Sequence, residues 1–320
     1  SGRNISLVKV LELFGGIGAP RKALENLGVD YEVVDYVEID PHAVKSYNTL
    51  YGENYEPQDI TEWDKDLDVD IVFHGSPCVN FSMAGDQSGG EQGSGTQSSL
   101  MWHTVRIVEK FRPKVVIWEN VKGVLNKNHI DTFTKYIDKL RELGYYSTYK
   151  VLDARDFGIP QARDRLFVIS ILGNEFDFNN LIIEDMKHIS EFITYNDNER
   201  YLVTQPSMVS QLPLEVNREN ERYNMVKEIK DFTWTISTKQ VRSPNAGVIN
   251  LSNGDYRYLT ERECWRLMGF TDVDYEKAKS VNPRRADFMN TQLYKQAGNS
   301  IVVQVLESIL LELLDTIELL

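Results

Sequence analysis

The first 172 residues alternate short apolar runs with stretches of helical periodicity, and this alternation constrains the fold more than any other feature of the chain. Six runs are expected to be strands: residues 8–14, 31–37, 69–73, 115–118, 146–151 and 166–171. Helical stretches lie between them, notably 20–27, 100–110 and 132–143, with Gly28 and Gly144 where helices should end. Strands and helices that alternate in this way form a parallel sheet with helices on both faces. We therefore expect a doubly wound α/β domain over residues 1–172.

The remainder of the chain has a different character. From residue 173 to about 285 it is richer in Asn, Glu, Ser and Tyr and less periodic, which predicts a second, smaller, irregular domain. Asn253-Gly254, between the apolar runs 248–251 and 256–259, is typical of a hairpin turn. Residues 286–320 end in an apolar run interrupted by polar residues. This pattern predicts an amphipathic helix that returns to the first domain, not a membrane span.

The charge and the cysteine content exclude several classes of protein. The formal net charge of −13 argues against a protein that coats nucleic acid non-specifically, although a local basic face could still bind DNA. The two cysteines, Cys78 and Cys264, have no Cys/His cluster at zinc spacing around them, so neither a disulfide framework nor a metal site is expected. No signal peptide is apparent, so we expect a soluble, cytoplasmic protein.

A glycine-rich turn follows the first expected strand. Gly15-Gly16-Ile17-Gly18 would let the backbone approach a ligand closely at the start of a helix. Glu38, at the end of the next strand, could accept hydrogen bonds from ribose hydroxyls, and Asp59 could accept one from an adenine amino group. A tight turn with a solvated Glu38 is an equal alternative. Because Ala19-Pro20-Arg21 follows Gly18, the turn departs from the G-x-G-x-x-G pattern of nicotinamide enzymes, which disfavours a pyrophosphate.

A second group of polar residues stands at the carboxyl ends of other strands. Ser76-Pro77-Cys78 follows the third strand, and Glu119 follows the fourth. Ligands bind at this edge of such sheets, so Cys78 is a candidate nucleophile, with a buried structural thiol as the alternative. Gln161, Arg163 and Arg165 alternate onto one face before the sixth strand and could hold an anion or a carbonyl oxygen. Asn299 or Ser300 is expected to cap the last helix at its N-terminus.

Taken in order, these motifs resemble a known family. The blocks F-G-G-I-G, E-I-D, D-I, G-S-P-C-x-x-F-S, E-N-V, Q-A-R-D-R, R-E-C-W-R-L-M-G-F and Q-A-G-N-S are similar to those of DNA (cytosine-5) methyltransferases of the bacterial or phage restriction-modification type. The resemblance runs from Leu11 to about Leu306, and only the segment between Leu172 and about Tyr258 carries no shared block. It implies a Rossmann-like, S-adenosylmethionine-dependent catalytic domain with a small target-recognition domain.

The resemblance also implies roles for individual residues. Cys78 would attack the cytosine, Glu119 would hold ring nitrogen 3 and the amino group, Arg163 would contact the ring carbonyl oxygen, and Arg165 would brace the catalytic loop. The residues expected to bind S-adenosylmethionine are Phe14, Gly15, Gly16, Ile17, Gly18, Glu38, Ile39, Asp59, Ile60, Pro77, Asn299 and Ser300. No metal is implied.

The chemistry that the resemblance implies explains these residue types. A thiolate added to carbon 6 makes carbon 5 of the ring nucleophilic, and the charge that develops needs a protonated carboxyl and a cation. We therefore expect burial to raise the pKa of Glu119. Stacking blocks this attack inside a duplex, so the target base must be flipped out. The Gly/Ser-rich segment 85–99 would then be a lid over DNA, with a flexible linker as the alternative.

The expected partner is double-stranded DNA, bound by a monomer at one target sequence, with a companion restriction endonuclease as a possible further partner. Candidate DNA contacts, which could instead be solvated loop residues, are Gln87, Thr235, Thr238, Lys239, Arg242 and Asn245. Ser76, Val79 and Ala19-Pro20 depart from the common family pattern. Of the alternatives, a tRNA cytosine methyltransferase would typically carry Pro-Pro-Cys at the nucleophile. A catalytically silent homologue would have lost Cys78, Glu119 or Arg163.

Overall fold

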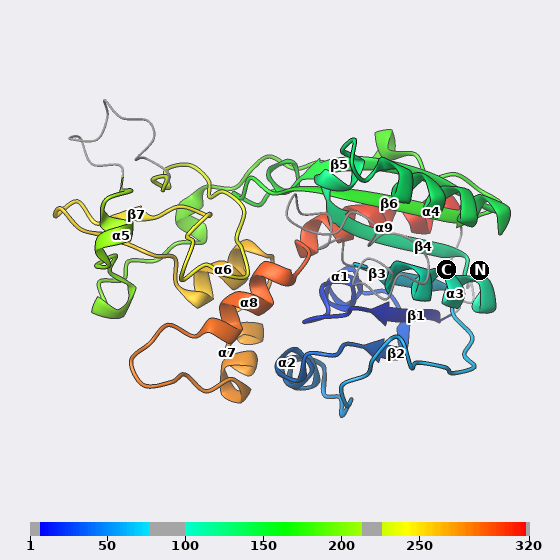
Figure 1. Cartoon of the computed structure of the whole chain (residues 1–320), viewed down its shortest axis with the longest axis horizontal. Coiled ribbons are helices and arrows are strands. Elements are labelled where there is room, and N and C mark those ends of the chain that lie inside the picture. Colours follow the sequence, from blue (N-terminus) through cyan, green and yellow to red (C-terminus); the bar gives the residue numbers. More distant parts are fainter. Residues whose placement is uncertain (1–6, 77–99, 213–225, 318–320) are drawn as a thin grey trace.

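A six-stranded mixed sheet forms the centre of the larger lobe (Figure 1). The computed structural model describes residues 7–76, 100–212 and 226–317. The strands are β1 (Val8–Leu13), β2 (Tyr31–Val37), β3 (Ile71–His74), β4 (Val115–Val121), β5 (Tyr145–Asp153) and β6 (Asp164–Leu172), in the order β2-β1-β3-β4-β6-β5. All six lie where the sequence predicts a strand, with ends that differ by up to three residues.

The prediction of a wholly parallel sheet is wrong at one strand. β1 pairs in parallel with β2 and β3, and β3 with β4, but β6 runs antiparallel to both of its neighbours, β4 and β5. Parallel neighbours need a crossover of a dozen or more residues, usually containing a helix. Only residues 154–163 connect β5 to β6, so the chain turns back instead.

Helices cover both faces of the sheet, which confirms the doubly wound architecture. Helices α1 (Ala19–Leu27) and α9 (Val303–Ile317) pack with strand residues such as Val10 and Ile71. On the opposite face, α3 (Leu100–Phe111) and α4 (Ile130–Glu142) pack with Leu11 and Val72. Neighbouring residues of one strand thus enter different cores, as the two-residue period requires. The expected helix ends are also confirmed, because Gly28 and Gly144 have φ of +68° and +96°.

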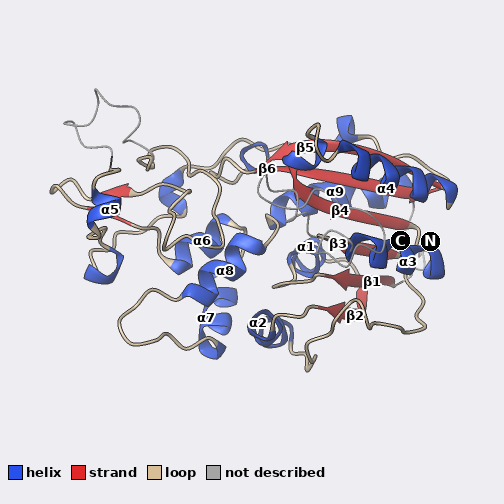
Figure 2. Cartoon of the chain, viewed as in Figure 1, coloured by secondary structure: helices blue, strands red, loops and turns tan. Residues whose placement is uncertain are grey.

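The smaller lobe is mostly irregular (Figure 2). It contains α5 (Pro206–Val209) and a short antiparallel pair, β7 (Ile249–Asn250) and β8 (Tyr256–Arg257), around a small apolar core. The hairpin predicted at Asn253-Gly254 is confirmed, because the nitrogen of Leu251 donates to the oxygen of Asp255 (3.0 Å) and Gly254 has φ +94°.

Three helices join the small lobe to the sheet: α6 (Glu261–Leu267), α7 (Asp272–Val281) and α8 (Thr291–Asn299). Their apolar residues belong to the same core as α1 and α9, and α2 (Pro41–Tyr51) packs on α7. A buried ion pair anchors β8 to α6, with 2.8 Å between Nη1 of Arg257 and Oε1 of Glu263. The division of the chain at residues 172 and 285 stays a prediction, since segments on both sides of each boundary share this core.

One stretch of the described residues, Thr291–Asp315, is long and apolar enough to pass a test for a membrane span by length and composition. It comprises α8 and α9 with a break between them, and 56% of its apolar window is buried inside the protein. Helix α9 packs against α1 in the main apolar core, and Asn26 of α1 also donates to Glu307 of α9 (2.9 Å).

Candidate active site

The glycine-rich turn connects β1 to α1 at the carboxyl edge of the sheet. Gly16 and Gly18 have φ of +52° and +76°, a region that favours glycine, and Gly18 is the N-cap residue of α1. Phe14 also has a positive φ of +55°. The chain can therefore leave β1, reverse, and enter α1 within five residues.

Glu38 lies directly after β2 and is bonded to this turn. Its Oε1 accepts from the nitrogen of Gly16 (3.0 Å), and its Oε2 accepts from the nitrogen of Asp40 (3.0 Å). Burial raises the pKa of this carboxyl, and these hydrogen bonds counteract the effect in part. Each oxygen keeps a second lone pair that could accept from a ligand hydroxyl.

The other residues expected near an adenine surround Glu38. The nitrogen of Gln58 donates to the Glu38 carbonyl oxygen (2.9 Å), which brings Asp59 and the buried Ile60 to this edge. Asp59 uses Oδ1 to accept from the nitrogen and hydroxyl of Thr61 (2.9 and 2.8 Å). Ile39 is 64% exposed, as an open wall of a ligand site would be.

One cavity brings some of the expected cofactor residues and the expected catalytic carboxyl together, whereas Gly18, Glu38, Ile39, Asp59 and Ile60 lie outside its lining. It opens between the glycine turn, the end of β3, and the end of α8. Its lining includes Phe14, Gly15, Gly16, Ile17, Glu119, Asn299 and Ser300. Residues more than 280 positions apart in the chain thus face one space.

Glu119, in β4, lies beside two cations. Nε of Arg165 is 3.6 Å from its Oε1, and the side chain of Glu119 is 13% exposed. Burial raises the pKa of Glu119, although the charges of Arg165 and Arg163 oppose the shift. The raised pKa predicted for this carboxyl is therefore confirmed in direction.

Arg163 is the more buried of the two cations, and both of its terminal nitrogens are engaged, whereas its buried Nε has no hydrogen-bond partner among the described residues. Nη1 donates to Gln161 Oε1 (3.2 Å) and the Ile236 carbonyl (2.9 Å). Nη2 donates to the carbonyls of Gly298 (2.8 Å) and Ser300 (3.1 Å). Arg163 therefore ties the strand edge to the small lobe and to the end of α8.

Cys78, Pro77 and Gln87 lie outside the described residues, as does the predicted lid over 85–99. The chain just before them is firmly bonded. The Ser76 carbonyl accepts from Nδ2 of Asn120 (2.8 Å), next to Glu119. The Ser76 hydroxyl contacts Nδ1 of His74 (2.8 Å). Nε2 of His74 in turn contacts the Tyr136 hydroxyl (3.0 Å). The segment that leads to Cys78 thus starts beside the candidate catalytic carboxyl.

The predicted N-cap role of Asn299 or Ser300 is wrong. Asn299 is the last residue of α8, Ser300 is the C-cap of that helix, and α9 begins only at Val303. The Q-A-G-N-S block contains helix-forming residues before its glycine, so α8 continues through it. A side chain on Gly298 would collide with the backbone of Ser237, which explains why this helix carries a glycine.

The candidate DNA contacts occupy different environments. Lys239, Arg242 and Asn245 are exposed on one loop of the small lobe. Thr238 is half-buried, and the hydroxyl of Thr235 donates to the Ala162 carbonyl (3.0 Å), beside Arg163. The exposed three could reach a nucleic acid, whereas the Thr235 hydroxyl already joins the two lobes.

Sequence reasoning missed several residues of this site, above all Glu12, Tyr36 and Tyr51. Glu12 lines the cavity from within β1, where a lone carboxylate in the apolar run V-K-V-L-E-L-F was a usable signal. Tyr36 and Tyr51 donate hydrogen bonds to the glycine turn from β2 and α2. No local pattern distinguishes them from other tyrosines of the chain.

The chain is similar in sequence to cytosine-specific DNA methylases. The model of the family "C-5 cytosine-specific DNA methylase" matches residues 8–315. The type II methyltransferase M2.ScrFI from Lactococcus lactis subsp. cremoris is 31% identical, with 96% of this chain and 99% of that protein covered. The type II methyltransferase M.HhaI from Haemophilus parahaemolyticus is 32% identical, with 96% and 94% covered. The crystal structure of S. pombe Dnmt2 methyltransferase matches with a TM-score of 0.72 at 20% identity, covering 96% of this chain and 98% of that one, which shows a common fold.

Proposed function

Because the chain belongs to the C-5 cytosine-specific DNA methylase family, a family of S-adenosylmethionine-dependent enzymes, we propose that it methylates carbon 5 of one cytosine within a short sequence of duplex DNA. The observation that carries the proposal is the cavity shared by the glycine turn and Glu119. A methyl donor held on the turn would lie next to a base held by the carboxyl.

The residues around the turn suit a cofactor that has a ribose and an adenine but no phosphate. Glu38 would accept from the ribose hydroxyls, Ile39 and Ile60 would contact the adenine, and Asp59 would accept from its amino group. Phe14, Gly15, Gly16, Ile17 and Gly18 would form the wall on one side, with Pro77, Asn299 and Ser300 on the other. The cofactor supplies the methyl group from its sulfonium.

Cys78 would open the reaction on a flipped cytosine. Its thiolate forms a bond to carbon 6, and the electrons of the 5,6 double bond become available at carbon 5. A protonated Glu119 donates to ring nitrogen 3 as negative charge develops there. After methylation, a base removes the carbon 5 proton, the double bond re-forms, and Cys78 leaves as a thiolate.

Arg163 and Arg165 have different hydrogen-bond partners and therefore suit different roles. Since both terminal nitrogens of Arg163 donate to four other acceptors, Arg163 suits the bracing role. Arg165 lies against Glu119, and within the described segments its side chain makes one hydrogen bond, to the Asp164 carbonyl (2.9 Å). We therefore assign the ring carbonyl oxygen to Arg165. This exchanges the two roles that the resemblance implies.

The biological setting that we propose is protective DNA methylation in a restriction-modification or phage system, because the relatives M2.ScrFI and M.HhaI are named type II methyltransferases. In this setting the enzyme would act as a monomer in the cytoplasm, with or without a companion endonuclease. Residues 173–285 would recognise the target, with Thr238, Lys239, Arg242 and Asn245 as DNA contacts. Gln87 would be a contact from the catalytic domain, whereas the Thr235 hydroxyl is already bonded to the Ala162 carbonyl.

Base-resolution mapping of modified cytosines in the DNA of an expressing host tests the proposal. We expect 5-methylcytosine at one short motif. It should be lost in Cys78→Ala and kept in Cys264→Ala, because Cys264 is a buried thiol in the core of α6. Unmodified DNA in a host that makes the protein in folded, soluble form would refute the assignment. Methylated cytosine in RNA alone would favour an RNA substrate.

The covalent step has its own test. DNA that carries 5-fluorocytosine at the target should trap the enzyme, because the carbon 5 fluorine cannot leave as the proton does. The adduct should form in wild type and in Cys264→Ala and be absent in Cys78→Ala. An adduct that survives Cys78→Ala would show that another group is the nucleophile.

A further inference from the structure

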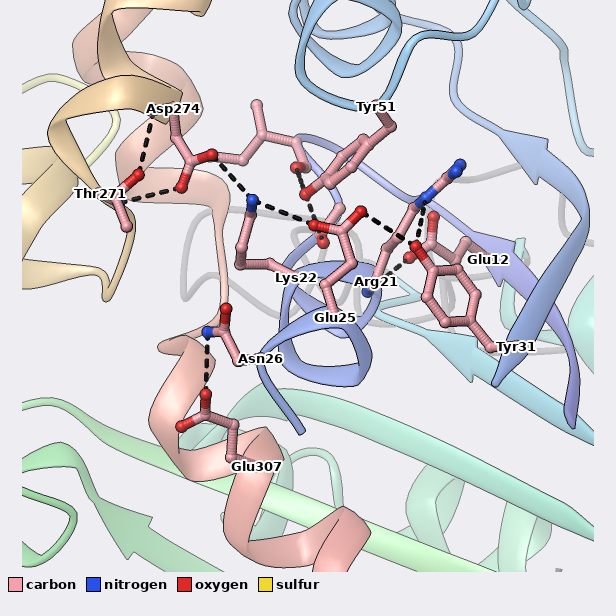
Figure 3. Close-up of polar contacts among 12 residues, drawn as sticks. Glu12, Arg21, Lys22, Glu25, Asn26, Tyr31, Tyr51, Thr271, Asp274 and Glu307 are labelled. Carbon is pink, nitrogen blue, oxygen red and sulfur yellow. Dashed lines mark hydrogen bonds and ion pairs between the residues drawn. The ribbon is translucent and has the colours of Figure 1, made fainter. Parts of the chain in front are cut away.

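Two tyrosine hydroxyls hold three consecutive carbonyls of the glycine turn. Tyr36, in β2, donates to the Gly16 carbonyl (2.5 Å). Tyr51, at the end of α2, is 2.9 Å from the carbonyls of both Ile17 and Gly18 (Figure 3). With Glu38 on the nitrogen of Gly16, the turn is bonded on both its donor and its acceptor sides.

The rings of these tyrosines also pack directly against the turn. A Cβ on Gly15 would lie 2.5 Å from the ring of Tyr36. A Cβ on Gly18 would lie 2.7 Å from the rings of Tyr47 and Tyr51. Tyr36 and Tyr47 stack with 3.7 Å between ring centroids. The aromatic side chains therefore determine how far the turn can move away from the cavity.

The guanidinium of Arg21 contacts the cluster formed by Tyr36, Tyr47 and Tyr51. The guanidinium of Arg21 lies 4.8 Å from the centroid of the Tyr51 ring, donates to the Tyr47 hydroxyl (3.3 Å), and pairs with Glu53 (3.1 Å). Burial raises the pKa of Tyr36 and Tyr51 far above the working range of an enzyme, so both hydroxyls remain donors.

We propose that Tyr36 and Tyr51 are positioning residues for the cofactor: their hydroxyls hold the backbone of Gly16, Ile17 and Gly18 in the conformation that binds S-adenosylmethionine. The inference rests on the proposed function of the turn. Both hydroxyls are bonded to backbone carbonyls of the turn, so each acts on the cofactor through the backbone. Removing a hydroxyl should weaken cofactor binding and leave the chemistry of the bound complex intact.

Tyr51→Phe and Tyr36→Phe keep the rings and remove the hydroxyls. We expect each to raise the Kd for S-adenosylmethionine, measured by calorimetry, about fivefold to tenfold. The KM for the cofactor should rise in parallel, while kcat at saturating cofactor and KM for DNA stay within about twofold of wild type.

Tyr31→Phe is the matched control. Its hydroxyl bonds to Glu25 (3.0 Å) and Arg21 (3.1 Å) at the far side of the same cluster and touches no carbonyl of the turn (Figure 3). The free energy of unfolding of Tyr31→Phe in urea should fall about as much as that of Tyr36→Phe and Tyr51→Phe. Its Kd for S-adenosylmethionine should stay at the wild-type value. Equal Kd values for all three variants and wild type would overturn the inference, as would an equal rise in Tyr31→Phe. A wild-type protein that binds no S-adenosylmethionine would instead refute the proposed function itself.

Discussion

Replacing Glu12 by Gln should remove a pH-dependent cost to stability that this buried carboxyl imposes. Glu12 is 1% exposed, and its Oε1 accepts from the nitrogen of Arg21 (3.1 Å) in the first turn of α1. Within the described part of the chain, its Oε2 has no hydrogen-bond partner. Burial raises the pKa of Glu12 to about 7, and the nearby Tyr47 hydroxyl and Arg21 charge counteract burial only in part.

The size of the effect follows from linkage between protonation and folding. Since the folded pKa exceeds the unfolded value of 4.5, the stabilising state is the protonated one. Its contribution is complete below pH 4.5 and is lost progressively as the pH rises from there through the folded pKa of about 7. The total loss is about 3 kcal/mol, of which about 1 kcal/mol falls between pH 6 and pH 8.

Urea unfolding of wild type and Glu12→Gln at pH 6 and pH 8 measures this directly. Other titrating groups affect both proteins alike, so the difference between the two pH-dependent losses isolates Glu12. The free energy of unfolding should fall by about 1 kcal/mol more in wild type than in Glu12→Gln over this interval. Parallel losses in the two proteins would show that Glu12 titrates near its ordinary value and would refute the reasoning from burial.

Two further predictions concern chemistry and stability. Glu119→Gln should lower kcat by about 100-fold or more while DNA binding persists. Because wild type needs the protonated carboxyl, its rate should fall as the pH rises through the raised pKa of Glu119, whereas the variant should show no such fall. An unchanged kcat in Glu119→Gln would exclude Glu119 as the proton donor to the ring. Glu263→Gln should lower the free energy of unfolding, measured in urea, by about 3 kcal/mol, because it leaves the charge of Arg257 buried and unpaired. The exposed control Asp272→Asn should cost less than about 1 kcal/mol, and equal costs would contradict the desolvation argument.

Local sequence patterns are enough to predict the strands, the tight turns and the order of the strand-end motifs. Apolar runs located all six strands, because a buried strand needs apolar residues whatever its neighbours are. The helix end at Gly28 and the turn at Asn253-Gly254 were predictable because glycine adopts a positive φ without steric cost, whatever the rest of the fold. The order of strand-end motifs was enough to identify the family and to select Glu119 and Glu38 as candidates.

Features that depend on which distant segments contact each other could be read only from the folded chain. The direction of β6 followed from a connection too short for a crossover, and no pattern within the strand records that. Arg163 could be assigned to bracing only after its acceptors, at Ile236, Gly298 and Ser300, had been located. Tyr36 and Tyr51 have the same composition and periodicity as any buried tyrosine. Their role arises because hydrogen bonds between residues 20 to 34 positions apart depend on how β2 and α2 pack against the turn, and packing is a property of the whole fold.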